Sequence, residues 1–204
     1  TRCSRDWSSD VCSSDLPFDE DIVLYGSISS GLFLTTNGGS TWTNLTMNGA
    51  IPCSNENTYG VVAVVFNPAH GTIFDAALGK NRCKVAYAAV WQGGIFQSRD
   101  GGNTWNKVSR GSSGNAQIPA DNGTVTHLVL GPADGKLFVG DSSAGFYSFA
   151  FNDTRNSGTW KFFAPSTSAT WFAIAVSPTD SNLLLVFDVG GRAWRSTDGG
   201  LSFS

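Results

Sequence analysis

Two carboxylates stand directly after apolar runs that are typical of β-strands. Asp188 opens the sequence Asp188-Val189-Gly190-Gly191, and Asp141 lies in Gly140-Asp141-Ser142-Ser143. A carboxylate in a loop can act as a general acid or base. It can equally close a turn, because its oxygens accept hydrogen bonds from nearby backbone amides. Both residues are therefore candidate site residues, and a purely structural turn role is the competing interpretation.

Aromatic and amide side chains near predicted strand ends could contact a ligand. Trp91 and Trp171 have flat apolar faces, which suit the C–H surfaces of sugar rings, and packing in the core is their alternative role. The predicted ligand contacts are Trp91, Gln92, Asp141 and Trp171. No Cys-x-x-Cys motif or Cys/His cluster suggests a metal site, and the sequence predicts no cofactor.

A short unit that occurs three times, at residues 35–42, 98–105 and 196–203, must help to position these residues. Each copy holds a hydroxyl residue, Asp or Asn two places later, a glycine pair, a second hydroxyl and an aromatic. The Asx-Gly-Gly core predicts a hairpin turn, because glycine reaches positive φ without strain and Asx side chains bond backbone amides. Alternation along a strand then allows the ring to pack inward. The residues of the unit are Thr35, Asn37, Gly39 and Trp42, then Ser98, Asp100, Gly102 and Trp105, then Ser196, Asp198, Gly200 and Phe203.

The strands around this unit recur in a fixed order. An apolar strand ends before a proline, which we expect to stop pairing because it lacks an amide donor. A second aliphatic strand follows, and a Gly-rich loop then leads to a third strand and the repeated turn. First strands are predicted at 61–66, 125–130 and 171–176, and second strands at 22–25, 84–91, 136–139 and 183–187. Four strands per unit predict an all-β fold, an incomplete β-propeller of about two full and two partial antiparallel blades.

The repeated unit resembles the Asp-box, or BNR, repeat, with Asn37 in place of the usual Asp and Phe203 in place of Trp. Such repeats occur in sialidases, in xyloglucan-active propeller hydrolases, in sortilin-like receptors and in photosystem assembly factors. The resemblance covers residues 22–204 and implies a propeller, which hosts several functions. It implies either glycan binding or hydrolysis, or a non-catalytic platform for protein interaction or assembly. A sialidase, which would need an arginine cluster to bind a carboxylate, is disfavoured, because Arg99 lies within a repeated turn and the sequence has no Arg-Ile-Pro-like start.

The loop at Asp188 resembles the Asp-Ile-Gly-Gly loop of the xyloglucan-active hydrolases, which implies that Asp188 is one of two catalytic carboxylates. Inverting hydrolysis needs a general acid and a general base about 6.5–9.5 Å apart. We expect the second carboxylate to come from outside this sequence. Arg192 departs from the family pattern, which has an aromatic residue soon after the loop. An ordinary turn remains the alternative for Asp188.

Residues 1–16 lack an apolar period and any relation to the repeat, and residues 6–16 resemble the translation of a sequencing-library adapter. We therefore expect residues 1–16 to be a non-native scar outside the fold and residues 17–204 to form a partial propeller domain. The first unit then lacks its first strand, so the chain is expected to be a fragment of a larger propeller. Setting aside Cys3 and Cys12, the pair Cys53 and Cys83 either forms one disulfide or stays as two free thiols.

Composition narrows the class of protein and its partners. The 204 residues include 13 basic and 16 acidic side chains, for a net charge of −3, which gives no basic footprint for nucleic acid. No apolar run approaches the roughly 18–20 residues of a transmembrane helix. The low charge and abundant Gly, Ser, Thr and Trp suit an extracytoplasmic or secreted all-β protein. Its expected partner is a polysaccharide or a protein ligand, and the oligomeric state is left open.

Overall fold

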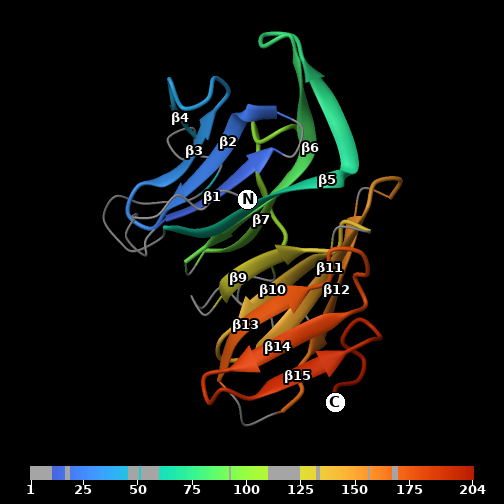
Figure 1. The fold of residues 1–204 in the computed structure, drawn as a ribbon. Coiled ribbons are helices and arrows are strands. Elements are labelled where there is room, and N and C mark those ends of the chain that lie inside the picture. Colours follow the sequence, from blue (N-terminus) through green and yellow to red (C-terminus); the bar gives the residue numbers. More distant parts are fainter. Residues whose placement is uncertain are drawn as a thin grey trace.

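The computed structural model describes residues 11–16, 19–45, 51, 60–91, 93–109, 125–131, 134–155, 157–166 and 170–204. Within these ranges the regular elements are all β-strands, in four antiparallel sheets that follow one another along the chain (Figure 1). The predicted all-β class is therefore confirmed. Nowhere in the described ranges is there a helix of sufficient length and apolarity to cross a membrane.

The strands of each sheet are paired in the order of the sequence. The first sheet contains β1 (Val11–Leu16), β2 (Asp19–Ser27), β3 (Gly31–Thr35) and β4 (Thr43–Asn44). The second contains β5 (Val61–Asp75), β6 (Lys80–Val90), β7 (Gly94–Ser98) and β8 (Asn106–Lys107). The third contains β9 (Val125–Leu130), β10 (Leu137–Asp141), β11 (Gly145–Asn152) and β12 (Ser157–Phe163). The fourth contains β13 (Trp171–Val176), β14 (Leu184–Asp188) and β15 (Ala193–Ser196).

Three apolar cores join neighbouring sheets face to face. Side chains alternate between the two faces of a strand, so one strand can serve two cores. In β6, Ala86 and Ala88 belong to the core shared with the first sheet, whereas Val85 and Tyr87 belong to the core shared with the third. The core between the third and fourth sheets includes Phe138, Phe146, Leu184 and Val186. Each interface thus buries one face of each of two sheets.

Residues 11–16 form β1, which differs from the expectation that residues 1–16 lie outside the fold. This strand pairs antiparallel with β2, from Val11 opposite Ser27 to Asp15 opposite Val23. Strand pairing uses the backbone donors and acceptors that every non-proline residue carries, so a segment without an apolar period can still complete a sheet. The first sheet consequently has four strands instead of three. The adapter-like origin of the segment stays a prediction.

The first strand of the second sheet extends past the proline that we expected to end it. β5 continues through Pro68 to Asp75. The register shifts between Asn67 and Thr72, whose partners are Val85 and Cys83. A bulge of this kind takes the intervening residues out of the ladder, so the missing amide of proline costs no hydrogen bond there.

Candidate functional site

The candidate residues lie at one end of the sheets, which we call the loop end: the turns after β6, β10 and β14. Asp141 is the last residue of β10, Asp188 is the last of β14, and Trp91 directly follows β6. These positions are equivalent in three successive sheets. Because consecutive strands are antiparallel, the turns between third and fourth strands, which hold the repeated unit, lie at the opposite end.

Asp188 is held by Arg192 in the turn between β14 and β15. Its Oδ1 accepts a hydrogen bond from the Arg192 amide at 2.8 Å, and its Oδ2 accepts one from Arg192 Nε at 2.7 Å and pairs with Nη2 at 2.7 Å. The backbone hydrogen bond of Arg192, followed by its side-chain bond and its charge, lowers the pKa of the Asp188 carboxyl. The side chain is only 2% exposed. Asp188 is therefore an ionised acceptor, which is unsuited to donating a proton near neutral pH.

Asp141 closes the equivalent turn in the third sheet. Its Oδ1 accepts hydrogen bonds from the Ser143 amide at 3.0 Å, the Ser143 hydroxyl at 2.9 Å and the Ala144 amide at 3.1 Å. The residue is 1% exposed, and Oδ2 is buried without a hydrogen-bond partner among the described residues. These contacts are those of an Asx turn. The predicted ligand contact at Asp141 would require this turn to open.

The predicted aromatic contacts differ in exposure. Trp171 is 3% exposed and packs edge-on against Phe146 and Trp194, with ring centroids 5.0 and 5.3 Å apart. It is a core residue, so the expectation that it stacks on a ligand is not supported by its position. Trp91 is 38% exposed, and its amide donates to the Gly60 carbonyl at 2.8 Å. Gln92 lies outside the described residues. Trp91 is consequently the more exposed of the two predicted aromatic contacts.

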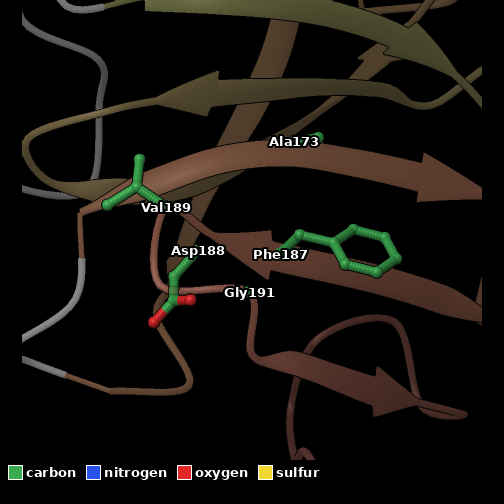
Figure 2. A pocket seen from close by; sticks show the side chains of 5 residues that line it. All are labelled: Ala173, Phe187, Asp188, Val189 and Gly191. Carbon is green, nitrogen blue, oxygen red and sulfur yellow. The ribbon is translucent and has the colours of Figure 1, made fainter.

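A shallow groove of about 580 Å³ lies beside Asp188 on the outer face of the fourth sheet. It is lined by Ala173, Phe187, Asp188, Val189 and Gly191 (Figure 2). Figure 2 shows the Phe187 ring along β14, with the Asp188 carboxylate and the Val189 side chain pointing to opposite sides of the turn. The groove is mainly apolar and the carboxylate is already engaged, so the groove by itself is not a catalytic pocket.

The three repeated units form the same hydrogen-bonded turn. In the second copy the Ser98 hydroxyl donates to Asp100 Oδ1 at 2.9 Å and accepts from the Gly102 amide at 2.8 Å. Asp100 Oδ1 also accepts from the Thr104 amide at 2.8 Å. The equivalent bonds are present in the first and third copies. The second glycine of the three copies has φ of 88°, 94° and 91°, a region that favours glycine.

The carboxylates of these turns are ionised acceptors. A hydrogen bond from the Ser202 hydroxyl, then one from its amide and others of the turn, lower the pKa of Asp198 to about 2. Burial raises the pKa of Asp100, but hydrogen bonds from Thr104 and Ser98 outweigh it, and the net direction is down. Both carboxylates hold their own backbone, which is a structural role and leaves no proton for catalysis.

The aromatic residues of the second and third repeated units pack toward the preceding sheet, and the aromatic residue of the first does not. Trp105 is 6% exposed and belongs to the core between the first and second sheets. Phe203 stacks on Phe163 of the third sheet at 5.8 Å. Trp42 is 44% exposed and contacts Tyr25 of its own sheet at 5.8 Å, which differs from the expected inward packing. Among the described residues no sheet precedes the first, so the Trp42 ring has no preceding sheet to pack against.

Cys83 carries a free, buried thiol. It donates a weak hydrogen bond to the Val85 carbonyl at 3.5 Å, and burial raises its pKa to about 11. Cys53 lies outside the described residues, so their predicted pairing stays a prediction. Among the described residues there is no cluster of three His, Cys, Asp or Glu side chains that could hold a metal ion.

In sequence, part of the chain is similar to xyloglucanases, and in fold the chain is similar to several kinds of protein. No protein-family model matches the chain. A stretch of 93 residues, 45% of the chain, is 30% identical to the oligoxyloglucan-reducing end-specific xyloglucanase of Emericella nidulans. That stretch corresponds to 10% of the xyloglucanase, so the chain matches a small part of this relative.

Solved structures similar to the chain include two GH74 enzymes. The GH74 enzyme of Niastella koreensis has a TM-score of 0.65 at 22% identity, covering 94% of this chain and 28% of that one. The GH74 xyloglucanase from Xanthomonas campestris has a TM-score of 0.64 at 21% identity, covering 94% and 29%. YCF48 bound to the D1 peptide has a TM-score of 0.55 at 14% identity, covering 95% and 52%. These likenesses confirm the predicted fold, an incomplete β-propeller.

Sequence reasoning missed how firmly Arg192 holds Asp188. The sequence analysis identified Arg192 only as a departure from a family pattern and predicted no contact with Asp188. An arginine four residues after a loop carboxylate is within reach of that carboxylate across a tight turn, and both its amide and its guanidinium are used here. The spacing was the available signal. The contact with Arg192 engages both oxygens of Asp188 and so changes the chemistry that this carboxylate can perform.

Proposed function

We propose that the chain is part of an extracytoplasmic Asp-box propeller of the glycoside-hydrolase type, which binds a xyloglucan-like polysaccharide at its loop end. The 30% identity over 93 residues to a xyloglucanase is the observation that carries this proposal. The turn bonding shared by the three repeated units supports the Asp-box assignment. The partial exposure of Trp91 at the loop end supports sugar binding, since flat rings stack on pyranose surfaces.

Within this proposal Asp188 is the general base. Its lowered pKa keeps it ionised at neutral pH, which suits accepting a proton from water and is incompatible with the acid role. Arg192 must then release Oδ2 when substrate binds, because both oxygens are engaged in the free protein. The general acid would come from a part of the protein outside this chain.

Titration calorimetry of the chain with xyloglucan oligosaccharides tests the binding proposal. Trp91→Ala should weaken binding about 2- to 12-fold, the equivalent of one aromatic contact of about 0.5–1.5 kcal/mol. Phe74→Ala is the matched control, since Phe74 is an exposed aromatic at the far end of the β5–β6 hairpin, and should leave the affinity unchanged. Absence of binding, or equal losses in both variants, would contradict the proposal.

The catalytic part is tested in the whole protein that contains this sequence. Asp188→Asn keeps the size of the side chain and its ability to accept from the Arg192 amide, but it cannot take up a proton. The release of reducing ends should fall at least about 100-fold while oligosaccharide binding persists. Hydrolysis that survives this substitution would remove Asp188 from the mechanism.

A non-catalytic platform for protein interaction is the second candidate function. One observation favours it: the Asp188 side chain is 2% exposed and is fully engaged by Arg192, as in a turn that serves only the fold. The similar structure of YCF48 was solved with a bound peptide, but at 14% identity this likeness concerns the fold alone. Absence of hydrolysis by the whole unsubstituted protein, together with affinity for peptides and none for glycans, would favour this candidate.

A further inference from the structure

The first repeated turn holds the sequence Asn37-Gly38, where the second and third copies have Asp100-Gly101 and Asp198-Gly199. An asparagine followed by glycine can deamidate. The backbone nitrogen of the glycine loses its proton and attacks the side-chain Cγ, and the side-chain nitrogen leaves as ammonia. Water then opens the resulting succinimide ring to aspartate or isoaspartate and returns the proton to the glycine nitrogen. Glycine favours the attack because it has no Cβ to shield its nitrogen, so Asn37 is a candidate site of spontaneous modification.

Both reacting groups are held by hydrogen bonds in the folded turn. The Gly38 nitrogen, which is the nucleophile, donates to the Asp21 carbonyl at 3.0 Å. Asn37 Oδ1 accepts from the Thr35 hydroxyl at 3.0 Å and from the Thr41 amide at 2.9 Å. Asn37 Nδ2 donates to Thr41 Oγ1 at 2.8 Å. Asn37 and Gly38 are exposed to water, so these four hydrogen bonds are what opposes ring closure.

The aspartate product fits the same turn. At the equivalent position of the second copy, Asp100 Oδ1 accepts from the Thr104 amide at 2.8 Å, and Oδ2 accepts from the Thr104 hydroxyl at 2.5 Å. The Thr41 hydroxyl accepts from Asn37 Nδ2, but a hydroxyl can also donate, so it can turn its proton toward a carboxylate. A hydrogen bond to a carboxylate is also the stronger of the two. Isoaspartate does not fit, because it adds one carbon to the main chain and displaces the rest of the turn.

We propose that Asn37 is a deamidation site that reacts only when the first repeated turn opens, and that its aspartate product rebuilds this turn. The rate in the folded protein is then the rate in the unfolded chain multiplied by the fraction of time that the turn is open. Each of the four hydrogen bonds lowers this fraction by a factor of about 2 or more. Deamidation of the folded protein should therefore be at least about 15-fold slower than deamidation of the unfolded chain.

Peptide mapping by mass spectrometry, after incubation at mildly alkaline pH with and without urea, tests the first half of this proposal. In urea, Asn37 should react at a rate similar to those of Asn48-Gly49 and Asn122-Gly123, since the local sequence alone sets the rate there. In the folded protein, Asn37 should react at least about 15-fold more slowly than in urea. Equal rates in the two conditions, or no reaction of Asn37 in urea, would overturn the proposal.

Substitutions that loosen the turn separate its local opening from unfolding of the whole protein. Thr35→Ala removes the hydroxyl that donates to Asn37 Oδ1 and accepts from the Gly39 amide, so deamidation of the folded protein should become at least about 4-fold faster. Ser98→Ala removes the equivalent hydroxyl from the second copy and should leave the rate at Asn37 unchanged. Thr41→Val, at an exposed position, removes one hydrogen bond and should speed the reaction about 2-fold or more. Equal acceleration by Thr35→Ala and Ser98→Ala, or none by Thr41→Val, would contradict local opening.

The fate of the product tests the second half of the proposal. Asn37→Asp should unfold at a urea concentration no lower than that of the unsubstituted protein at pH 7. When a deamidated sample is refolded, aspartate at position 37 should be enriched in the folded fraction and isoaspartate in the unfolded fraction. A less stable Asn37→Asp protein, or the same ratio of the two products in both fractions, would show that the turn does not accept aspartate selectively. These results do not depend on glycan binding or hydrolysis, so they test a claim separate from the proposed function.

Discussion

Replacing the second glycine of a repeated turn by alanine should cost more in the fourth sheet than in the second. Gly102 and Gly200 have φ of 94° and 91°, so an alanine at either site is strained by about 1–3 kcal/mol. A Cβ on Gly102 would meet its nearest neighbour, Leu24 Cδ2, at 3.9 Å, which is ordinary contact. A Cβ on Gly200 would lie 2.9–3.1 Å from three atoms of the Phe163 ring.

Phe163 cannot move aside easily, because it stacks between Phe146 and Phe203 with centroids 5.8 Å from each. Overpacking of this kind adds about 1–3 kcal/mol, so Gly200→Ala should lose about 2–6 kcal/mol in total and Gly102→Ala about 1–3. In a domain of this size the difference corresponds to about 2–12 °C in Tm.

Thermal and urea unfolding of both variants measure this difference directly. Gly79→Ala is a strain-only control, since Gly79 has φ of 64° and nothing within 4 Å of an added Cβ. It should behave like Gly102→Ala. Equal losses at Gly102 and Gly200 would refute the reasoning, because they would show that the last turn does not pack on the Phe163 ring.

Three further predictions follow from buried or ionised groups. The pKa of Asp198 is lowered to about 2, and that of Asp100 is lowered as well. The stabilisation by these carboxylates is therefore complete above the unfolded pKa of about 3.9 and is lost as the pH falls toward the folded values. The free energy of unfolding, measured from pH 6 to pH 2, should decline below about pH 4, and the decline should be smaller in Asp100→Asn. Cys83 is buried with its pKa raised to about 11, so mass spectrometry should detect alkylation of this thiol at pH 7 only after unfolding. Arg82 is 3% exposed and pairs with Asp75 at 2.9 Å, so Asp75→Asn should destabilise by about 3 kcal/mol in urea unfolding, and Arg82→Met, which removes the buried charge, by less.

Local chemistry made the repeated turns predictable. Each turn is closed by hydrogen bonds between residues two to four positions apart, as between Ser98, Asp100 and Thr104. Such contacts depend on residue type and spacing alone, so a single sequence reveals them. The same holds for the order of strands, which follows from apolar runs separated by glycine and proline. The sequence analysis did not predict β1, which pairs through its backbone, or the part of β5 beyond Pro68.

Burial and charge pairing were decided by contacts between distant segments. Trp42 and Trp105 occupy the same position of the same unit, yet among the described residues only Trp105 is covered by the preceding sheet. Trp171 was expected to meet a ligand and instead fills the core with Phe146. Asp153 pairs with Lys84, 69 residues away in the preceding sheet, which no local pattern foretells.

The sequence by itself thus determined the all-β class, the repeated turns and the places where loops could carry a site, since these depend on backbone preferences and short-range hydrogen bonds. Only the tertiary structure decided which rings are buried and that Asp188 is engaged by Arg192. The physical reason is that exposure and the electrostatic state of a side chain are set by what surrounds it. For most of these residues the surroundings come from another sheet.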